Sequence, residues 1–286
     1  MDLLAEAGGL KLWMDDSWSV SFFSSPYVGH RLLSAVDIYQ GADFGEEAFS
    51  PVSGVVHKIM RFDSPSPGGG SLPEYLILIG KNHSLARIMH VEPSVSEGEL
   101  VRVGEPIGIF IKNGFFSYWV DAGMHVEVRK KTSIMRSTGG LELKPAPALT
   151  ETNGYSDESV SLKGRVMRST ERNTVVELNH ENNVKVGDKI CRVDGTTSLD
   201  YCGLLGAYDL GSVVYFNGIE LGKVKHKGSY MSLVENNPLI VYVDGTRFRG
   251  LSFGLGCERI KLLPPHYPGP VYERDSMLDV VIENEG

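Results

Sequence analysis

The chain has 286 residues, 42% of them hydrophobic and 22% charged, with a formal net charge of −8. Such a composition is typical of a soluble globular protein that is long enough for two domains. Acidic and basic residues are interspersed, and the longest basic run is Arg129-Lys130-Lys131. Nucleic acid and membranes are therefore not expected as partners, because a concentrated positive patch is what both require. A small molecule or a protein is the expected partner, and the sequence does not determine the oligomeric state.

Targeting signals and disulfides are not expected either. The N-terminal residues Met1–Glu6 lack the basic region and long apolar core of a signal peptide, and no stretch approaches the roughly 20 apolar residues that span a bilayer. The three cysteines, Cys191, Cys202 and Cys257, form no Cys-x-x-Cys pair, which favours free thiols in a reducing compartment. These features predict a cytoplasmic location.

Short apolar segments rich in valine and isoleucine alternate with glycine turns, a pattern that favours β structure. In the N-terminal half, strands are expected within residues 10–23, 32–39, 51–59, 75–79, 86–91, 109–111 and 123–129. Residues 26–31 are expected to form a loop, and 63–73, rich in glycine, serine and proline, an exposed hairpin tip. Gly54 is expected where the backbone makes a crossing too tight for a side chain.

The C-terminal half shows the same pattern. Strands are expected within 162–193, 201–224 and 229–253, with Asn217-Gly218 and Asp244-Gly245 as hairpin turns. The stretch 132–158 has little periodicity, which places a domain boundary near residue 150. Gly250-Leu-Ser-Phe-Gly254 fits the pattern of a nucleophile elbow, but it lies between expected strands rather than before a helix. No helix longer than about three turns is expected, so the chain is predicted to be all-β.

The segment Gly123–Arg129 alternates with the period of two that marks a half-buried strand. Its apolar residues would face a core: Met124, Val126 and Val128. Its other residues, His125 and Glu127 among them, would share the opposite face, which is either a solvated surface or the wall of a site. The aromatic residues just before it are expected mainly in the core, with Phe116 and Tyr118 on the side that a pocket would use.

Two glycine-containing segments, Pro51–Val56 and Val101–Gly108, resemble the barrel-sandwich hybrid of biotinyl and lipoyl carrier domains. With Asp37, His90 and the run Gly123–Arg129 added, the order of residues also resembles that of lysostaphin-type zinc endopeptidases, which elaborate the same β topology.

A more specific resemblance, carried by Ser34–Tyr39 and Gly114–Arg129, is to an uncharacterised archaeal family with a biotin/lipoyl-like domain. It spans residues 10–148 of this chain. The resemblance implies that residues 1–150 form a barrel-sandwich hybrid domain. Residues 151–286 lie outside it and are expected to form a smaller β-barrel-like domain of unassigned type.

A carrier domain needs a lysine at the tip of an exposed hairpin, because its cofactor is amide-linked there. The candidates are Lys58 and Lys81, and neither has the flanking residues of an attachment lysine. Lys58 also lies inside an expected strand. Carriage of a covalent cofactor is therefore not expected, and the domain would act at most as a docking piece that lacks its lysine.

The zinc endopeptidase resemblance implies a partial metal site. Asp37 and His125 match two of its metal ligands, and His90 matches a histidine on a neighbouring strand that assists catalysis. Leu33 and Gly123, however, stand where those enzymes have histidines. The mapped set therefore supplies two ligands, whereas catalytic zinc normally has three from the protein and one from water.

Two residues are candidates for a third ligand. His30 lies seven residues before Asp37, and in a continuous strand an odd separation would point it to the opposite face unless the chain bends near Arg31. Glu127 shares the face of His125, about 7 Å along the strand, and is the expected third ligand. The predicted site is thus Asp37, His125 and Glu127 for metal, with His90 as the candidate catalytic residue.

Three functions follow from this sequence. The leading one is a non-catalytic protein that binds a ligand or partner in a degenerate, metallopeptidase-like cleft, where Asp37 pairs with His125 without metal. The second is a zinc-dependent hydrolase with an altered ligand set, in which His90 acts as acid or base. The third is the carrier-like docking domain. No cofactor is required by the first or third, and Zn²⁺ is the cofactor of the second.

Overall fold

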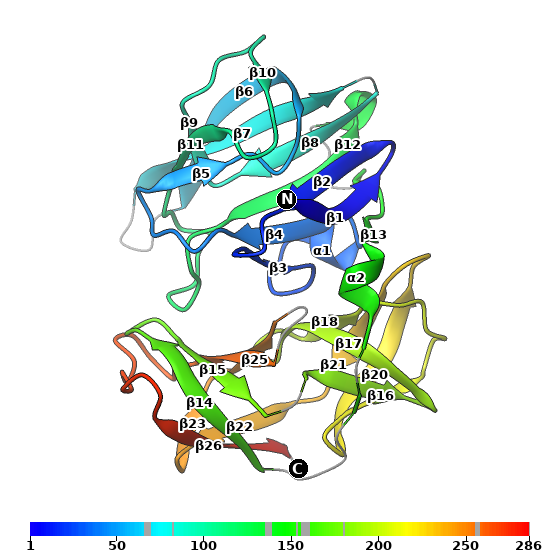
Figure 1. Cartoon of the computed structure of the whole chain (residues 1–286), viewed down its shortest axis with the longest axis vertical. Coiled ribbons are helices and arrows are strands. Elements are labelled where there is room, and N and C mark those ends of the chain that lie inside the picture. Colours follow the sequence, from blue (N-terminus) through cyan, green and yellow to red (C-terminus); the bar gives the residue numbers. More distant parts are fainter. Residues whose placement is uncertain are drawn as a thin grey trace. The chain divides into compact units, whose positions relative to one another are not determined.

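The computed structural model describes residues 1–65, 70–81, 83–134, 139–152, 154–155, 161–179, 181–254 and 258–285 (Figure 1). The chain is almost entirely β, as predicted. The helical segments among the described residues are single turns: α1 (Val28–Arg31), α2 (Pro147–Thr150) and a 3₁₀ turn at Lys131–Ser133. It divides into two compact units. Unit 1 comprises Met1–Val20 and Tyr27–Ala146, and unit 2 comprises Ser21–Pro26 and Pro147–Gly286. The second unit is as long as the first, rather than smaller as expected.

A seven-stranded sheet that curves into a half-barrel forms the body of unit 1. In spatial order its strands are β10 (Leu100–Val101), β6 (Gly54–Pro65), β7 (Ser71–Lys81), β8 (Ser84–Met89), β12 (Met124–Lys130), β4 (Ala35–Tyr39) and β3 (Ser19–Ser21). Two three-stranded sheets complete the unit. One is β5 (Glu47–Phe49), β11 (Pro106–Phe110) and β9 (Val91–Pro93); the other is β13 (Lys144–Pro145), β1 (Asp2–Ala7) and β2 (Leu10–Met14).

Strand β12 lies between β8 and β4 and is buried on both faces. Its apolar residues Met124, Val126 and Val128 enter the core as the alternation predicts. The opposite face is not solvated, because His125, Glu127 and Arg129 are at most 4% exposed. Antiparallel pairing sets His125 beside Asp37 of β4 and Met89 of β8. This polar face of β12 is therefore an enclosed wall.

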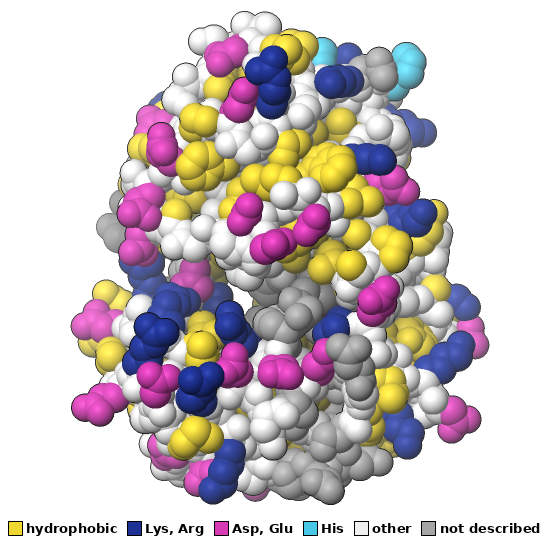
Figure 2. All heavy atoms as spheres, viewed as in Figure 1, with side chains coloured by type: hydrophobic (Ala, Val, Ile, Leu, Met, Phe, Trp, Pro, Cys, Tyr) yellow, Lys and Arg dark blue, Asp and Glu magenta, His cyan; other side chains and the backbone are white. Residues whose placement is uncertain are grey.

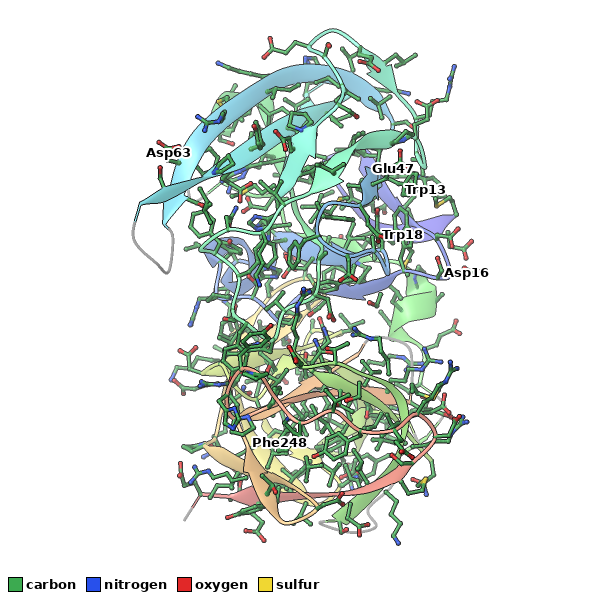
Figure 3. The ribbon with its side chains drawn as sticks, turned by 90° about the vertical axis from the view of Figure 1, so that its left-hand side faces the viewer. Trp13, Asp16, Trp18, Glu47, Asp63 and Phe248 are labelled. Carbon is green, nitrogen blue, oxygen red and sulfur yellow. The ribbon has the colours of Figure 1, made fainter. Side chains whose placement is uncertain are left out.

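Gly54 marks a close approach of two strands, as expected from the sequence. A Cβ on Gly54 would lie 2.5 Å from the Cα of Gly80 on β7, a separation that real Cβ atoms do not tolerate. From Gly54 the strand β6 runs alongside β7 in a long hairpin, and Asp63 lies toward its outer end (Figure 3). Part of the predicted hairpin tip, residues 66–69, lies outside the described residues.

Unit 2 contains a closed six-stranded barrel. Its strands, in order around the barrel, are β16 (Asn183–Val186), β19 (Val213–Phe216), β20 (Ile219–Lys227), β21 (Ser232–Asn236), β18 (Tyr201–Leu204) and β17 (Lys189–Thr196), and β17 pairs back with β16. From β17 the sheet continues through β24 (Gly250–Phe253), β25 (Arg259–Leu263), β15 (Thr174–Leu178), β14 (Ser161–Ser169), β26 (Met277–Asn284), β22 (Leu239–Val243) and β23 (Thr246–Phe248).

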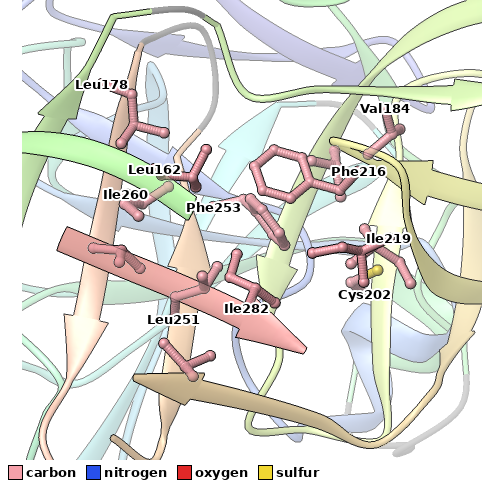
Figure 4. Packing of buried hydrophobic residues seen from close by; sticks show 14 of the residues in the cluster. Leu162, Leu178, Val184, Cys202, Phe216, Ile219, Leu251, Phe253, Ile260 and Ile282 are labelled. Atoms are coloured by element: carbon pink, nitrogen blue, oxygen red, sulfur yellow. The ribbon is translucent and has the colours of Figure 1, made fainter. Parts of the chain in front are cut away.

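Alternate residues of these strands fill one apolar core (Figure 4). Phe216 and Phe253 meet edge to face within it, with ring centres 5.0 Å apart. Both predicted hairpin turns are present, because Asn217-Gly218 and Asp244-Gly245 all have the positive φ angles that such two-residue turns require. Ser252 of the Gly-x-Ser-x-Gly pattern lies within strand β24 and donates to the carbonyl of Gly195, so this segment is not a nucleophile elbow.

The short segment Ser21–Pro26 packs within unit 2, although it lies far from the rest of that unit in sequence. The backbone N–H of Phe22 donates to Oδ2 of Asp194 (2.5 Å), and the Tyr201 hydroxyl donates to the carbonyl of Ser25. Phe23 is fully buried, and its ring occupies the space where Gly203 has no side chain. The sequence predicts a single boundary near residue 150 and gives no sign of this earlier excursion.

Charged side chains of both signs are interspersed over the face drawn in Figure 2. Within the described parts of the chain, no helix has the length and apolarity needed to cross a bilayer.

Candidate metal centre

His30 reaches the face of the sheet that carries Asp37 and His125 because the chain turns twice before β4. Residues 28–31 form one helical turn, and Leu33 then adopts a left-handed conformation with φ of 58°. The N–H of Leu33 donates to the carbonyl of His30, and that of Ser34 to the carbonyl of Gly29, which closes the turn. The expected loop at 26–31 thus ends in a helical turn, and the strand expected from residue 32 begins only at Ala35. The argument from strand parity against His30 therefore does not apply.

Three donor atoms converge at this point of unit 1: Nε2 of His30, Oδ1 of Asp37 and Nδ1 of His125. The two nitrogens each lie close to the carboxylate oxygen, at 3.2 Å for His30 and 2.9 Å for His125. The nitrogens are 3.2 Å from each other. His30 and His125 are at most 1% exposed and Asp37 is 8% exposed. The donors form a compact, nearly equilateral triangle.

The size of this triangle fits a tetrahedral metal ion. A zinc ion with bonds of about 2.0 to 2.1 Å separates its ligand atoms by about 3.3 Å. The three observed separations, 2.9, 3.2 and 3.2 Å, are close to that value. Two imidazole nitrogens and one carboxylate oxygen are also a donor set that zinc accepts. The residues present therefore fit one face of a zinc tetrahedron, which leaves a fourth position for water or a substrate.

Glu127 orients His125 from the side opposite the triangle. Its Oε1 lies 3.0 Å from Nε2 of His125, and its Oε2 accepts a 2.5 Å hydrogen bond from Nε of Arg129. Since a carboxylate accepts the proton on Nε2, the lone pair of His125 is left on Nδ1, which is the atom of the triangle. A Cβ on Gly29 would lie 2.8 Å from Oε1 of Glu127, so glycine lets α1 approach this carboxylate.

Electrostatics reinforce the arrangement. Burial alone would raise the pKa of Asp37, but the charge of His30 and the hydrogen bond to His125 outweigh it and keep that pKa well below its ordinary value. Burial would likewise lower the pKa of His125, yet the hydrogen bonds to Asp37 and Glu127 raise it to about 9. The carboxylate of Asp37 is therefore ionised, and without metal His125 also carries a proton on Nδ1 near neutral pH. A metal ion at the triangle would take the place of that proton, while the proton on Nε2 stays with Glu127.

His90 lies beside this cluster, with its ring centre 6.5 Å from that of His125. Its Nδ1 is 2.5 Å from Oε2 of Glu74, and its backbone N–H donates to Oε1 of the same carboxylate. Nε2 of His90 then accepts from the hydroxyl of Tyr27, 3.3 Å away. The residue holds a φ of 72°, uncommon outside glycine, which indicates that its position is fixed by these surroundings.

The sequence-based site and the structure overlap in part. Asp37 and His125 come together as expected, and His90 lies next to them. Glu127 lies on the far nitrogen of His125, engaged by Arg129, so its carboxylate is not part of the triangle, and His30 holds the third corner. Glu74 is not among the site residues predicted from the sequence. Its one signal in the sequence is that it is an acidic residue directly before the apolar run at 75–79.

Comparisons with known proteins add little about function. A family model described as "Domain of unknown function (DUF8155) N-terminal domain" matches residues 11–145, close to the range of the resemblance noted from the sequence. No curated protein matches the chain. Among solved structures, the NMR solution structure of lysostaphin is similar at 13% identity and a TM-score of 0.24, over 83% of this chain and 87% of that one. At this TM-score the likeness carries no argument.

Proposed function

We propose that the chain is a zinc-dependent hydrolase whose metal is held by Nε2 of His30, Oδ1 of Asp37 and Nδ1 of His125. The observation that supports this most is the triangle of donor atoms, with sides of 2.9 to 3.2 Å that match a face of a zinc tetrahedron. Three protein ligands and one open position are the usual composition of a catalytic rather than a structural zinc site. This is the zinc-dependent hydrolase with an altered ligand set that follows from the sequence, except that His30 takes the place of Glu127 as the third ligand.

The surrounding residues have distinct tasks in such an enzyme. Zinc, when bound, supplies a Lewis acid that makes water nucleophilic near neutral pH. Glu127, itself clamped by Arg129, keeps the lone pair of His125 on Nδ1. Glu74 holds the proton of His90 on Nδ1, so that Nε2 can take up a proton and return it as a general base and acid. The Tyr27 hydroxyl, whose pKa is raised mainly by burial, stays protonated and donates toward Nε2 of His90.

Metal content tests the ligand set directly. The full chain, purified without a histidine tag, is expected to hold about one zinc ion per molecule by elemental analysis. His30→Ala and Asp37→Ala should each lose it, and His57→Ala, which removes an exposed histidine of β6, should keep it. Metal-free protein whose melting temperature does not change on addition of zinc would overturn the proposal.

A second candidate function is the non-catalytic binding of a ligand at the same site, and one observation favours it. The donors are almost completely buried, and the ring of Tyr27 packs 4.8 Å from that of His125, which limits the approach of a large substrate. A hydrolysis assay with a panel of esters and amides distinguishes the enzyme from the binding protein. An enzyme loses turnover but keeps zinc in His90→Ala, whereas a binding protein holds zinc and has no turnover in either form.

A further inference from the structure

Aromatic side chains lead from the buried triangle to the surface of unit 1. The ring of Tyr27 lies 4.8 Å from that of His125, and the ring of Phe115 lies 6.0 Å from Tyr27 in an edge-to-face arrangement. Phe115 is 37% exposed, Tyr27 is half-buried and His125 is buried. Successive rings therefore connect the donor cluster with solvent.

A second ring stands on the same side. Phe116 packs edge to face against His90, with ring centres 4.7 Å apart, and against Phe44 at 5.2 Å. Phe115 is also near His90, at 6.3 Å. Both phenylalanines therefore adjoin the histidine that the proposed reaction uses. Neither is enclosed in the core, so their outward surfaces remain available.

The segment that carries these rings is fixed rather than loose. Oδ1 of Asn113 accepts from the backbone N–H of Phe115, and the carbonyl of Asn113 accepts from that of Phe116. The side-chain amide of Asn113 donates to Oε2 of Glu74 at 2.7 Å. Glu74 is also the residue that holds His90. One buried carboxylate thus sets the positions of the aromatic segment and of His90 together.

From this placement we propose that Phe115 and Phe116 form a subsite that selects substrates with a planar apolar group next to the bond to be cut. This inference rests on the proposed zinc hydrolase. A planar group entering from solvent meets the exposed ring of Phe115 first and can stack or pack edge to face there. An aromatic side chain of a peptide and the aryl group of an ester present the same chemistry to this wall. Because the wall is held in place beforehand, little ordering is required of the protein on binding.

Hydroxamates provide a probe that needs no known substrate, since they chelate zinc in an open site. Titration calorimetry on the zinc-loaded full chain is expected to give about tenfold tighter binding of benzohydroxamate than of acetohydroxamate. In Phe115→Ala this ratio should fall to nearly one while the affinity for acetohydroxamate is unchanged. Phe115→Tyr should restore the ratio, and Phe62→Ala, which removes a similarly exposed phenylalanine of β6, should leave it unaltered.

The outcomes separate the two proposals. If acetohydroxamate binds but the ratio is the same in Phe115→Ala as in the parent chain, the zinc site stands and the aromatic subsite is overturned. If the chain takes up no zinc, neither hydroxamate binds, and both proposals are overturned.

Discussion

Oε1 of Glu127 lies 3.0 Å from Nε2 of His125, the ring nitrogen that points away from Asp37. The same carboxylate is paired with Arg129, which is 1% exposed and is among the largest fully buried side chains of the described chain. A buried arginine is thus used to hold the group that orients one histidine. Such an arrangement costs desolvation free energy. In return, it fixes the orientation of the His125 ring and keeps a proton on Nε2, so that Nδ1 faces the triangle.

Glu127→Gln should weaken zinc binding. The amide can no longer accept the proton of His125 and the bonds of Arg129 with the full charge of a carboxylate, and loss of such a partner typically costs 10- to 100-fold in metal affinity. Competition with a chromophoric chelator measures the affinity. Glu47→Gln, an exposed change on β5, is the matched control. Equal affinity in Glu127→Gln and the parent chain would show that Glu127 does not orient His125.

Arg129→Leu should destabilise unit 1 strongly. The change takes away part of the positive charge that compensates the buried carboxylate of Glu127, which keeps its hydrogen bond with His125. The free energy of unfolding is expected to fall by about 3 kcal/mol. The double variant Glu127→Gln/Arg129→Leu should lose less than the sum of the two single changes, because the pair is already broken in each. Urea unfolding of all four proteins measures this coupling, and strict additivity would contradict it.

Asp194 should make the stability of the protein depend on pH. Burial raises the pKa of this carboxyl to about 7, despite the hydrogen bonds that it accepts near Ser21 and Phe22. Between about pH 4 and pH 7 the folded chain therefore keeps a proton that the unfolded chain releases. Stability should fall as pH rises through this window and level off above it, by a few kcal/mol in total.

Asp194→Asn removes this titration. The variant is expected to lose less stability than the parent chain between pH 5 and pH 8, measured as the shift of the urea midpoint. Asp188→Asn, at an exposed position, should keep the parental slope. A slope that survives in Asp194→Asn would mean that other groups cause it.

Gly54→Ala should be destabilising through steric conflict. The new methyl group would meet the backbone of Gly80 at 2.5 Å, and backbone cannot yield as the end of a flexible side chain can. Overpacking of this kind costs about 1 to 3 kcal/mol. Gly41→Ala is a useful comparison, because Gly41 has a φ of 77° but no atom within 4 Å of the added Cβ. Thermal melting of both variants checks the prediction. The loss in Gly41→Ala reports backbone strain alone, and the prediction fails if Gly54→Ala melts at the temperature of the parent chain.

The parts of the fold that follow from local pattern could be predicted from the sequence. The two-residue period of 123–129 identified β12 and the shared face of His125 and Glu127. Glycine after asparagine or aspartate identified the turns at 217–218 and 244–245. In each of these cases neighbouring residues alone determine the outcome, since they fix either the side-chain alternation or the sign of φ.

The third corner of the triangle depends on one backbone angle. His30 is on the same side as Asp37 because Leu33 has a positive φ, a conformation that side chains of this kind rarely adopt and that its sequence context does not announce. Similarly, Glu74 meets His90 only through the register of β7 with β8, which places Leu76 opposite Met89. A shift of one residue would send Glu74 to the other face.

The excursion of Ser21–Pro26 into unit 2 has a consequence for how the protein is made. The Phe22 backbone bonds to a residue 172 positions later, so this pairing cannot form until most of the chain has been synthesised. Until then the nascent N-terminal half carries Phe23 without the residues of unit 2, Gly203 among them, that its ring packs against. Division of the gene near residue 150 would leave Phe23 on one fragment and the residues that its ring packs against on the other. The two halves are therefore expected to be produced well together, or on co-expression, and poorly as separate pieces.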